Sequence, residues 1–224
     1  GTTGESATLT HQEHKKIISI AVDQAKGKVP IIAGAGSNST DEALDLTKYA
    51  KKVGADYALV ITPYYNKPTQ KGLYMHFKTI VEKADIPAIV YNVPSRSGVN
   101  LLPSTLAELA ELKNIVAVKE ASGNLEQMAE ILYLCGDKIN LLSGDDKILL
   151  PVLSIGGKGV ISVVANIIPE KVSTMIKKFQ EGNYKEVQEI FMKVIYPLSR
   201  SMFYETNPIP VKTAARLMGL PSGE

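Results

Sequence analysis

Six short apolar runs, rich in β-branched residues, alternate with longer segments of helical pattern, and this alternation restricts the fold most. The runs cover residues 29–36, 57–62, 87–92, 115–118, 139–143 and 159–164. Runs this short are typical of strands buried in a parallel sheet. Predicted helices lie at residues 10–24, 39–52, 70–83, 125–134, 169–181, 184–204 and 209–218, with short ones after Pro103 and Asp146. The pattern is that of repeated βα units.

Two architectures consist of such units, the doubly wound sheet and the (β/α)8 barrel. A polar side chain stands at the C-terminal end of most of the apolar runs, at Thr62, Tyr91, Lys119, Ser143 and Ser162. Barrel enzymes place their chemistry at that end of the strands. The glycine turn at residues 34–36 has Ser39 where a dinucleotide fingerprint needs its third glycine. We therefore expect an α/β fold, a (β/α)8 TIM barrel over residues 1–181, with a C-terminal helical extension over residues 182–224.

A barrel of this class has eight strands, and six can be recognised in the sequence. The chain begins with a glycine-rich stretch, residues 1–6, that has the composition of a loop. We therefore expect that the first two strands and the first helix are missing, roughly 40 residues at typical βα sizes. Open edges would then make the 224 residues alone fold poorly or aggregate.

Charge and composition limit the partners of the chain. The formal net charge is +2 and basic residues form no block, so nothing in the sequence attracts a nucleic acid. Hydrophobic residues make up 45% of the chain, which is ordinary for a globular protein, and no apolar run reaches the length of a membrane span. The single Cys135 fits a reducing compartment. We expect a cytoplasmic protein that binds neither nucleic acid nor membrane.

Lys119 ends the apolar run of residues 115–118. Because side chains alternate along a strand, Ile115, Ala117 and Lys119 share one face. Burial at the end of that face would desolvate the amine, lower its pKa and favour the neutral nucleophile that forms Schiff bases. A strand-end lysine that reaches into water or pairs with Glu120 is common, and from this segment alone it is the preferred interpretation.

Seven short motifs favour the Schiff-base interpretation of Lys119 over the solvent-exposed one, because they occur together and in a fixed order. They cover residues 1–6, 62–68, 91–98, 118–121, 143–146, 159–162 and 207–212. The chain resembles the dihydrodipicolinate synthase family, part of the class I aldolase superfamily that also includes N-acetylneuraminate lyase. The resemblance covers essentially the whole chain, and it implies that the family's first strand, first helix and most of the second strand are missing and that the C-terminal helical region is incomplete. It implies a Schiff-base enzyme that condenses pyruvate with L-aspartate-4-semialdehyde to 4-hydroxy-tetrahydrodipicolinate, a step of lysine and diaminopimelate biosynthesis.

The resemblance also implies catalytic roles for individual residues. Lys119 would form the Schiff base with pyruvate, so no cofactor is needed. Tyr91, Thr3 and Tyr65 would relay protons. The family takes the relay tyrosine from an adjacent subunit, so the resemblance implies a homo-oligomer, a dimer of dimers, in which Tyr65 completes a neighbouring site.

Substrate-binding residues follow from the same resemblance. Thr2 and Thr3 would bind the carboxylate of pyruvate, and Gly144 and Ile161 would shape the pocket floor. Arg96 would bind the carboxylate of aspartate semialdehyde, because a guanidinium offers two parallel donors to a carboxylate. A loop arginine in water is the plainer alternative.

A second site is implied at the positions where lysine-regulated members of the family bind lysine as a feedback inhibitor. These positions are Ser6, Ala7, His11, His14, Asn38, Glu42 and Tyr64. Glu42 would bind the ammonium group of lysine, and Tyr64 would lead toward the relay tyrosine.

No metal site is expected. Two histidines alone, His11 and His14, are a poor metal site, and a solvated helix start explains them equally well. Asp145 and Asp146 are expected at the start of a helix, where the dipole favours carboxylates.

Two alternative functions stay open. One is another pyruvate-dependent aldolase of the superfamily, an N-acetylneuraminate or 2-keto-3-deoxygluconate lyase. By the resemblance, Arg96 argues against it, because sialic-acid lyases generally have no arginine there. The other is a non-catalytic homologue that senses lysine, and the presence of Lys119, Tyr91, Thr3 and Tyr65 argues against that.

Overall fold

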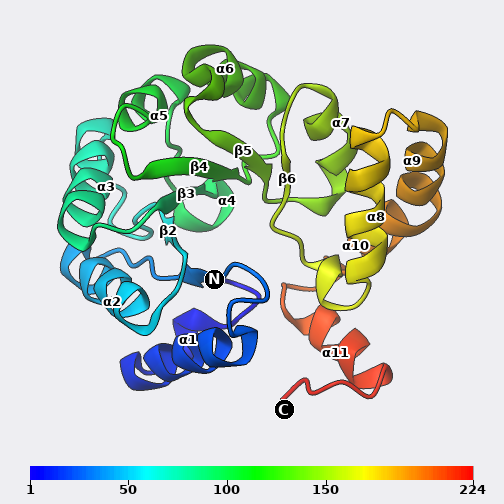
Figure 1. Cartoon of the computed structure of the whole chain (residues 1–224), viewed down its shortest axis with the longest axis horizontal. Helices are drawn as coiled ribbons and strands as arrows, with labels where there is room; N and C mark the ends of the chain where they lie inside the picture. Colours follow the sequence, from blue (N-terminus) through cyan, green and yellow to red (C-terminus); the bar gives the residue numbers. More distant parts are fainter. Residues whose placement is uncertain (224) are drawn as a thin grey trace. The chain divides into compact units, whose positions relative to one another are not determined.

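The computed structural model describes residues 1–223 and contains all six predicted strands (Figure 1). They are β1 Ile32–Gly34, β2 Tyr57–Ile61, β3 Ala88–Asn92, β4 Ile115–Glu120, β5 Asn140–Ser143 and β6 Gly159–Val160. The pairs β1–β2, β2–β3, β3–β4 and β5–β6 are parallel, and the hydrogen-bonded order follows the chain order. The fold class is α/β, as the repeated βα pattern predicts.

The chain divides into two compact units. The first comprises Gly1 and the chain from Ser6 to Leu141, and the second comprises Thr2–Glu5 and the chain from Leu142 onward. The helices of the first unit are α1 His11–Ala25, α2 Thr40–Val53, α3 Gln70–Ala84, α4 Pro94–Ser97, α5 Pro103–Leu109 and α6 Leu125–Cys135, with 3-10 turns at Ser6–Thr8 and Gly136–Lys138. Helices α2, α3, α5 and α6 pack side by side along strands β2 to β4 (Figure 1).

Helix α3 shows why these segments fold as they do. Its apolar residues recur at helical spacing, so that Leu73, Phe77, Ile80 and Val81 form one face, and all four are buried. The Thr69 side chain caps the start of the helix by accepting a hydrogen bond from the Gly72 N–H group at 3.2 Å. The spacing of the apolar residues thus determines which side of the helix is buried, and the Thr69 cap marks where the helix begins.

The first turns of α1 and α2 are capped in different ways. At α1 a capping box is complete, because Thr10 accepts from the Glu13 N–H group at 3.3 Å and Glu13 accepts from the Thr10 N–H group at 2.8 Å. At α2 Ser39 still caps the helix, but the Glu42 side chain turns away and accepts from the Ser37 hydroxyl at 2.7 Å. That carboxylate is therefore available to a neighbouring group instead of closing its own helix.

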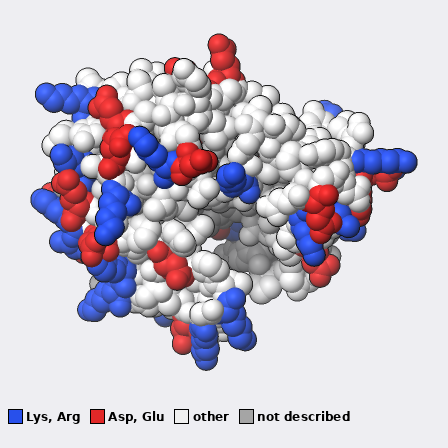
Figure 2. Space-filling view, turned by 45° about the horizontal axis from the view of Figure 1, so that its top comes forward, with Lys and Arg blue, Asp and Glu red and all other residues white. Residues whose placement is uncertain are grey.

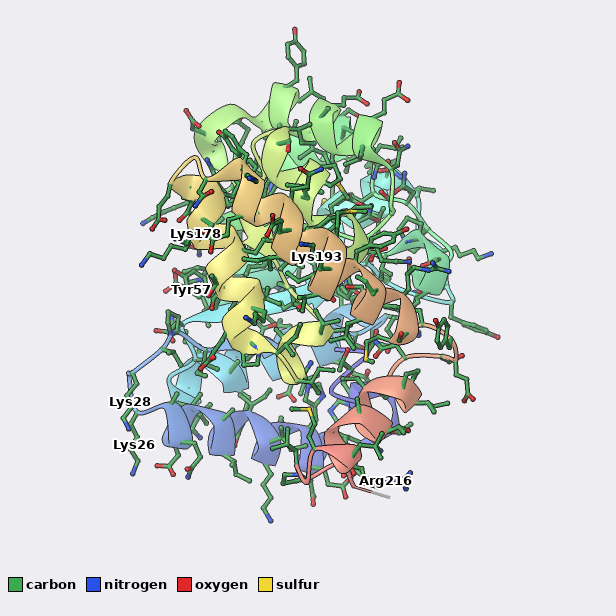
Figure 3. All side chains as sticks on the ribbon, turned by 90° about the vertical axis from the view of Figure 1, so that its right-hand side faces the viewer. Lys26, Lys28, Tyr57, Lys178, Lys193 and Arg216 are labelled. Atoms are coloured by element: carbon green, nitrogen blue, oxygen red, sulfur yellow. The ribbon has the colours of Figure 1, made fainter. Side chains whose placement is uncertain are left out.

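The second unit contains the end of β5, the whole of β6 and a set of helices around its own core. The helices are α7 Leu149–Ser154, α8 Pro169–Gln180, α9 Tyr184–Ile190, α10 Tyr196–Ser201 and α11 Ile209–Leu217, with 3-10 turns at Asp146–Ile148 and Val164–Asn166. The predicted helix at 184–204 is interrupted by a π-helical turn at Phe191–Ile195. Fully buried Leu149, Val164 and Met175 belong to this core. Lys178 forms ion pairs with Glu181 and Glu186, both at 3.4 Å (Figure 3).

The surface carries mixed charge. Figure 2 shows Lys and Arg side chains interspersed with Asp and Glu side chains on the visible face. In the turn after α1, Lys26 and Lys28 extend into solvent (Figure 3). Among residues 1–223, no helix is long and apolar enough to cross a membrane.

Candidate active site

Lys119 and Tyr91 lie next to each other at the ends of two paired strands. The register of β3 and β4 places Tyr91 opposite Lys119. The amine Nζ of Lys119 lies 4.0 Å from the centroid of the Tyr91 ring. Tyr91 is buried and Lys119 is half-buried, while Ile115 and Ala117 on the same face of β4 are buried. The two side chains that the resemblance brings together thus lie side by side on neighbouring strand ends, with Lys119 partly shielded from solvent.

The next residue of each strand faces the opposite way and is entirely buried. Asn92 pairs in register with Glu120, and neither side chain is exposed to solvent. Glu120 Oε2 accepts hydrogen bonds from Asn92 Nδ2 at 2.9 Å and from Gln127 Nε2 at 3.2 Å. Glu120 Oε1 accepts from the Ser122 N–H group at 2.7 Å. Lys119 and Tyr91 on one face are thus backed by a hydrogen-bonded polar pair on the other.

Arg96 lies in a loop that is shaped by short-range hydrogen bonds. Residues Pro94–Ser97 of this loop form the one-turn helix α4. The buried Ser97 hydroxyl donates to the carbonyl groups of Val93 and Val99, at 3.1 and 2.9 Å. Gly98 ends the turn with a φ of 73°, a conformation that favours glycine. This loop holds the exposed Arg96 just beyond the end of β3, which contains Tyr91.

Tyr65 projects from the loop that follows β2. Its φ of 72° is unusual for a residue with a side chain, and 90% of the side chain is exposed. Tyr64 beside it is half-buried, and Thr62 at the strand end is fully buried. A strained backbone that presents an aromatic ring to solvent is a feature of binding and catalytic loops.

Thr2 and Thr3 lie in the short segment Thr2–Glu5, which belongs to the second unit. The Asn207 side chain donates from Nδ2 to the Thr3 hydroxyl at 3.0 Å. The loop closes on itself through the Glu5 N–H group and the Thr2 carbonyl at 3.0 Å, and Lys212 donates to the Glu5 carboxylate at 3.1 Å. Asn207 and Lys212 therefore hold Thr3 and Glu5, although they lie about 200 positions away in the sequence.

Gly144 and Ile161 lie at the ends of β5 and β6. The Ile161 N–H group donates to the Ser143 carbonyl at 2.9 Å, which places Ile161 beside the residue that precedes Gly144. Asp145 accepts from the Lys147 N–H group at 2.9 Å and caps the following turn, as expected of a carboxylate at a helix start.

The neighbouring Asp146 is almost completely buried. Its carboxylate accepts from the N–H groups of Val163 and Val164 at 2.8 and 3.2 Å. Burial raises the pKa of Asp146, and these hydrogen bonds oppose the rise. Among residues 1–223, no three His, Cys, Asp or Glu side chains are grouped so that they could hold a metal ion.

Of the residues expected at the regulatory site, His11 and Glu42 lie close together in the first turns of α1 and α2. His11 Nε2 lies 3.5 Å from Glu42 Oε1, and both side chains are about half exposed. His14 Nε2 lies 2.7 Å from the Gly34 carbonyl, and burial lowers the pKa of His14. The carbonyl of Asn38 accepts a hydrogen bond from the Asn66 side chain at 3.1 Å. This bond connects the region to the loop after β2 that carries Tyr64 and Tyr65. Ser6 and Ala7 form the 3-10 turn just before α1.

Comparison with known proteins gives this geometry a context. The chain matches the dihydrodipicolinate synthetase family over residues 1–224. This chain belongs to that family. A 4-hydroxy-tetrahydrodipicolinate synthase of Geotalea uraniireducens is 55% identical to it over 224 residues, which are 100% of this chain and 77% of the relative.

Two solved structures of the dihydrodipicolinate synthetase family are close in fold. The chloride-inhibited dihydrodipicolinate synthase from Acinetobacter baumannii, complexed with pyruvate, is 43% identical with a TM-score of 0.96, over 100% of this chain and 77% of that one. The enzyme from Cyanidioschyzon merolae, with lysine bound, is 46% identical with a TM-score of 0.96, over 100% of this chain and 76% of that one.

Two groups around the site were not predicted. Asn207, which donates to Thr3, lies in the motif at residues 207–212, for which the sequence predicts no role of its own. The hydrogen-bonded set around Glu120 was missed because Glu120 was considered only as a partner of Lys119. Its position directly after the reactive lysine, on the opposite face of a buried strand, was the available signal.

Proposed function

We propose that this member of the dihydrodipicolinate synthetase family catalyses the 4-hydroxy-tetrahydrodipicolinate synthase reaction, the condensation of pyruvate with L-aspartate-4-semialdehyde. One observation carries the proposal: the half-buried Lys119 amine lies 4.0 Å from the ring centroid of Tyr91, on paired strand ends. The name of the relative that is 55% identical supports it. The Acinetobacter structure with pyruvate supports the choice of the first substrate.

The chemistry begins at the Lys119 amine. The neutral amine attacks the ketone carbon of pyruvate, and loss of one water gives an iminium. The iminium withdraws electrons, so a methyl proton can leave and an enamine forms. The enamine carbon attacks the aldehyde of aspartate semialdehyde. The amino group of the adduct then attacks the iminium carbon, closes the ring and displaces Lys119. One water is released overall, and no cofactor takes part.

Each of these steps moves a proton, so a relay beside the amine is required. Tyr91 is the nearest candidate, because its ring lies against Lys119. Thr3 and Tyr65 would extend the relay, and the outward-facing, strained Tyr65 suits delivery to the site of a second copy of the chain. We therefore propose a homo-oligomer, a dimer of dimers, in which neighbouring subunits exchange this tyrosine.

Substrate carboxylates need their own partners. We propose that Thr2 and Thr3 bind the carboxylate of pyruvate and that Gly144 and Ile161 shape the pocket floor. Arg96 would bind the carboxylate of aspartate semialdehyde, and the hydrogen-bonded Ser97 fixes the backbone that carries it. A loop held in one conformation loses less entropy on binding than a mobile loop.

We further propose that the fold is the (β/α)8 barrel class with a C-terminal helical extension. A parallel order that follows the chain without reversal supports the barrel over a doubly wound sheet, whose order reverses at its switch point. The lone Cys135 supports a reducing cytoplasmic location.

Lysine would act as a feedback inhibitor at the cluster of His11, His14, Asn38, Glu42 and Tyr64, with Ser6 and Ala7. The Glu42 carboxylate lies within this cluster and is half exposed, so it can accept an ammonium group. The hydrogen bond between Asn66 and the Asn38 carbonyl links the cluster to the loop of Tyr65. The Cyanidioschyzon structure with lysine supports this proposal.

The test is a direct assay of the full chain with pyruvate and aspartate semialdehyde, with and without lysine. We expect condensation, and inhibition by lysine. Cleavage of N-acetylneuraminate or 2-keto-3-deoxygluconate without condensation would replace the proposed function with that of another aldolase. Lysine binding without either activity would indicate a sensor.

A further inference from the structure

The buried carboxylate of Glu120 lies directly behind the reactive strand ends. In β4 it follows Lys119, and in the neighbouring β3 its register partner Asn92 follows Tyr91. Alternation along the strands turns Lys119 and Tyr91 to one face and Glu120 and Asn92 to the other. The chemical steps of the proposed function use none of the side chains on this second face.

The carboxylate is held by three uncharged N–H groups from three different segments. They are the Asn92 side chain on β3, the Gln127 side chain on α6 and the Ser122 backbone after β4, at 2.9, 3.2 and 2.7 Å. All three groups donate, so both oxygens of Glu120 act as acceptors, the pattern of a carboxylate. Glu120 itself is 0% exposed.

The set extends to the loop after β3, where Asn100 lies. Asn92 Nδ2 donates to Asn100 Oδ1 at 2.8 Å, and Asn100 Nδ2 donates to Gln127 Oε1 at 2.7 Å. Asn92 Oδ1 accepts from the Leu101 N–H group at 3.0 Å. The ends of β3 and β4, the β3–α5 loop and the start of α6 are therefore joined through one group of polar side chains, which we call the Glu120 cluster: Asn92, Asn100, Glu120 and Gln127.

Such a cluster needs a reason, because burying a carboxylate among neutral groups is unfavourable unless each of its hydrogen bonds is made. An apolar residue at position 120 would fill the space between sheet and helices at lower cost. What the cluster adds is geometry, since each hydrogen bond requires a fixed distance and direction. Fixing the backbone at residues 92 and 120 also fixes their neighbours, Tyr91 and Lys119.

We propose that Glu120 is a positioning residue, which acts through the Glu120 cluster to hold the Lys119 amine against the Tyr91 ring. The inference rests on the proposed function, and it adds a residue that touches neither substrate. Small displacements of reacting groups have large effects on rate, so loss of the cluster should lower turnover more than substrate affinity.

The sharpest variant is Glu120→Gln, which keeps the size of the side chain. The amide replaces one acceptor oxygen by a donor NH2 group, so at least one of the three N–H groups loses its acceptor. We expect kcat to fall about 10- to 100-fold. KM for each substrate should change by less than about threefold, because the groups proposed to bind the carboxylates are unaltered. Borohydride trapping of pyruvate should still go to completion, but more slowly.

The control is Thr47→Val, which removes a buried hydrogen bond of 2.6 Å to the Ala43 carbonyl inside α2, away from the strand ends. It should lower the melting temperature and leave kcat unchanged. Should Glu120→Gln fail to fold, Gln127→Met removes only the 3.2 Å hydrogen bond to Glu120 and the contacts with Asn100. It should lower kcat in the same way, by a smaller factor.

The outcomes separate the two claims. If the unaltered chain condenses pyruvate with aspartate semialdehyde while Glu120→Gln and Gln127→Met keep its kcat, the positioning role is wrong and the proposed function stands. A fall in kcat of equal size in Thr47→Val would also overturn the positioning role, because it would reflect stability alone. If the unaltered chain catalyses no condensation, the proposed function fails and takes this inference with it.

Discussion

Replacement of the buried His76 should make the fold less sensitive to acid. His76 lies in α3, is 5% exposed, and pairs through Nδ1 with the Thr40 hydroxyl at 2.9 Å. Within residues 1–223, its Nε2 atom has no hydrogen-bond partner. Burial lowers the pKa of His76 from 6.5 to about 4, because the charged imidazolium would lose its hydration.

The direction in which stability changes with pH follows from the linkage between protonation and folding. Below pH 6.5 the unfolded chain binds a proton at His76 that the folded chain refuses, so stability is complete above 6.5 and is lost as the pH falls toward about 4. At about 1.4 kcal/mol for each pH unit, the whole effect is roughly 3 kcal/mol, and about 2 kcal/mol is already lost at about pH 5. His76→Gln keeps a polar partner for Thr40 and carries no titrating group.

The assay is urea unfolding at about pH 8 and about pH 5, followed by circular dichroism. The unaltered chain should lose about 2 kcal/mol more than His76→Gln on going to the lower pH. Phe77→Leu, in the same helix and fully buried, is the control, and its cost should be the same at both values. Equal acid sensitivity of the His76→Gln variant and the unaltered chain would refute the reasoning.

Two further predictions concern the site and the sheet. Arg96→Ala should raise KM for aspartate semialdehyde about tenfold or more while borohydride trapping of pyruvate continues, and an unchanged KM in steady-state assays would remove Arg96 from that role. Gly36→Ala should lower the free energy of unfolding by roughly 3 kcal/mol, because the added Cβ would lie 2.4 Å from the Ile61 backbone nitrogen. If urea unfolding gives the variant the same free energy of unfolding as the unaltered chain, this close approach is contradicted.

The apolar pattern predicted strands correctly where the buried residues are also hydrogen-bonded in the sheet. The strand at 57–62 is observed as β2, Tyr57–Ile61, because its residues are both apolar and paired. The run at 159–164 predicts a longer strand than β6, which ends at Val160. Val163 and Val164 are buried, yet their N–H groups bind Asp146 instead of a strand. Hydrophobicity reports burial, and it cannot tell which partner the backbone takes.

Helix α1 contains an apolar residue that the periodicity predicts to be buried but that is exposed. Its periodicity predicts that Ile17 and Ile18 share the buried side of the helix. Only Ile18 is buried, and Ile17 is 50% exposed. Period locates a helix, but how wide a face becomes covered depends on the neighbouring elements.

The candidate site was predictable in part for a physical reason. Lys119 and Tyr91 could be brought together from sequence because both end apolar strands that are neighbours in chain order. The Glu120 cluster could not, since its hydrogen bonds join β3, β4, α6 and a loop through side-chain directions that no short pattern encodes. The pairing of Thr3 with Asn207 joins residues 204 positions apart, and no local signal reports such a contact.

The central claim is that the Lys119 amine forms a Schiff base with pyruvate. The most direct measurement is incubation of the full chain with pyruvate and sodium borohydride, followed by peptide mass spectrometry. The account predicts an added mass of about 72 Da, that of the reduced pyruvate adduct, on the peptide that contains Lys119, and loss of both label and condensation in Lys119→Arg. A label on a different lysine, or full activity of Lys119→Arg, would contradict it.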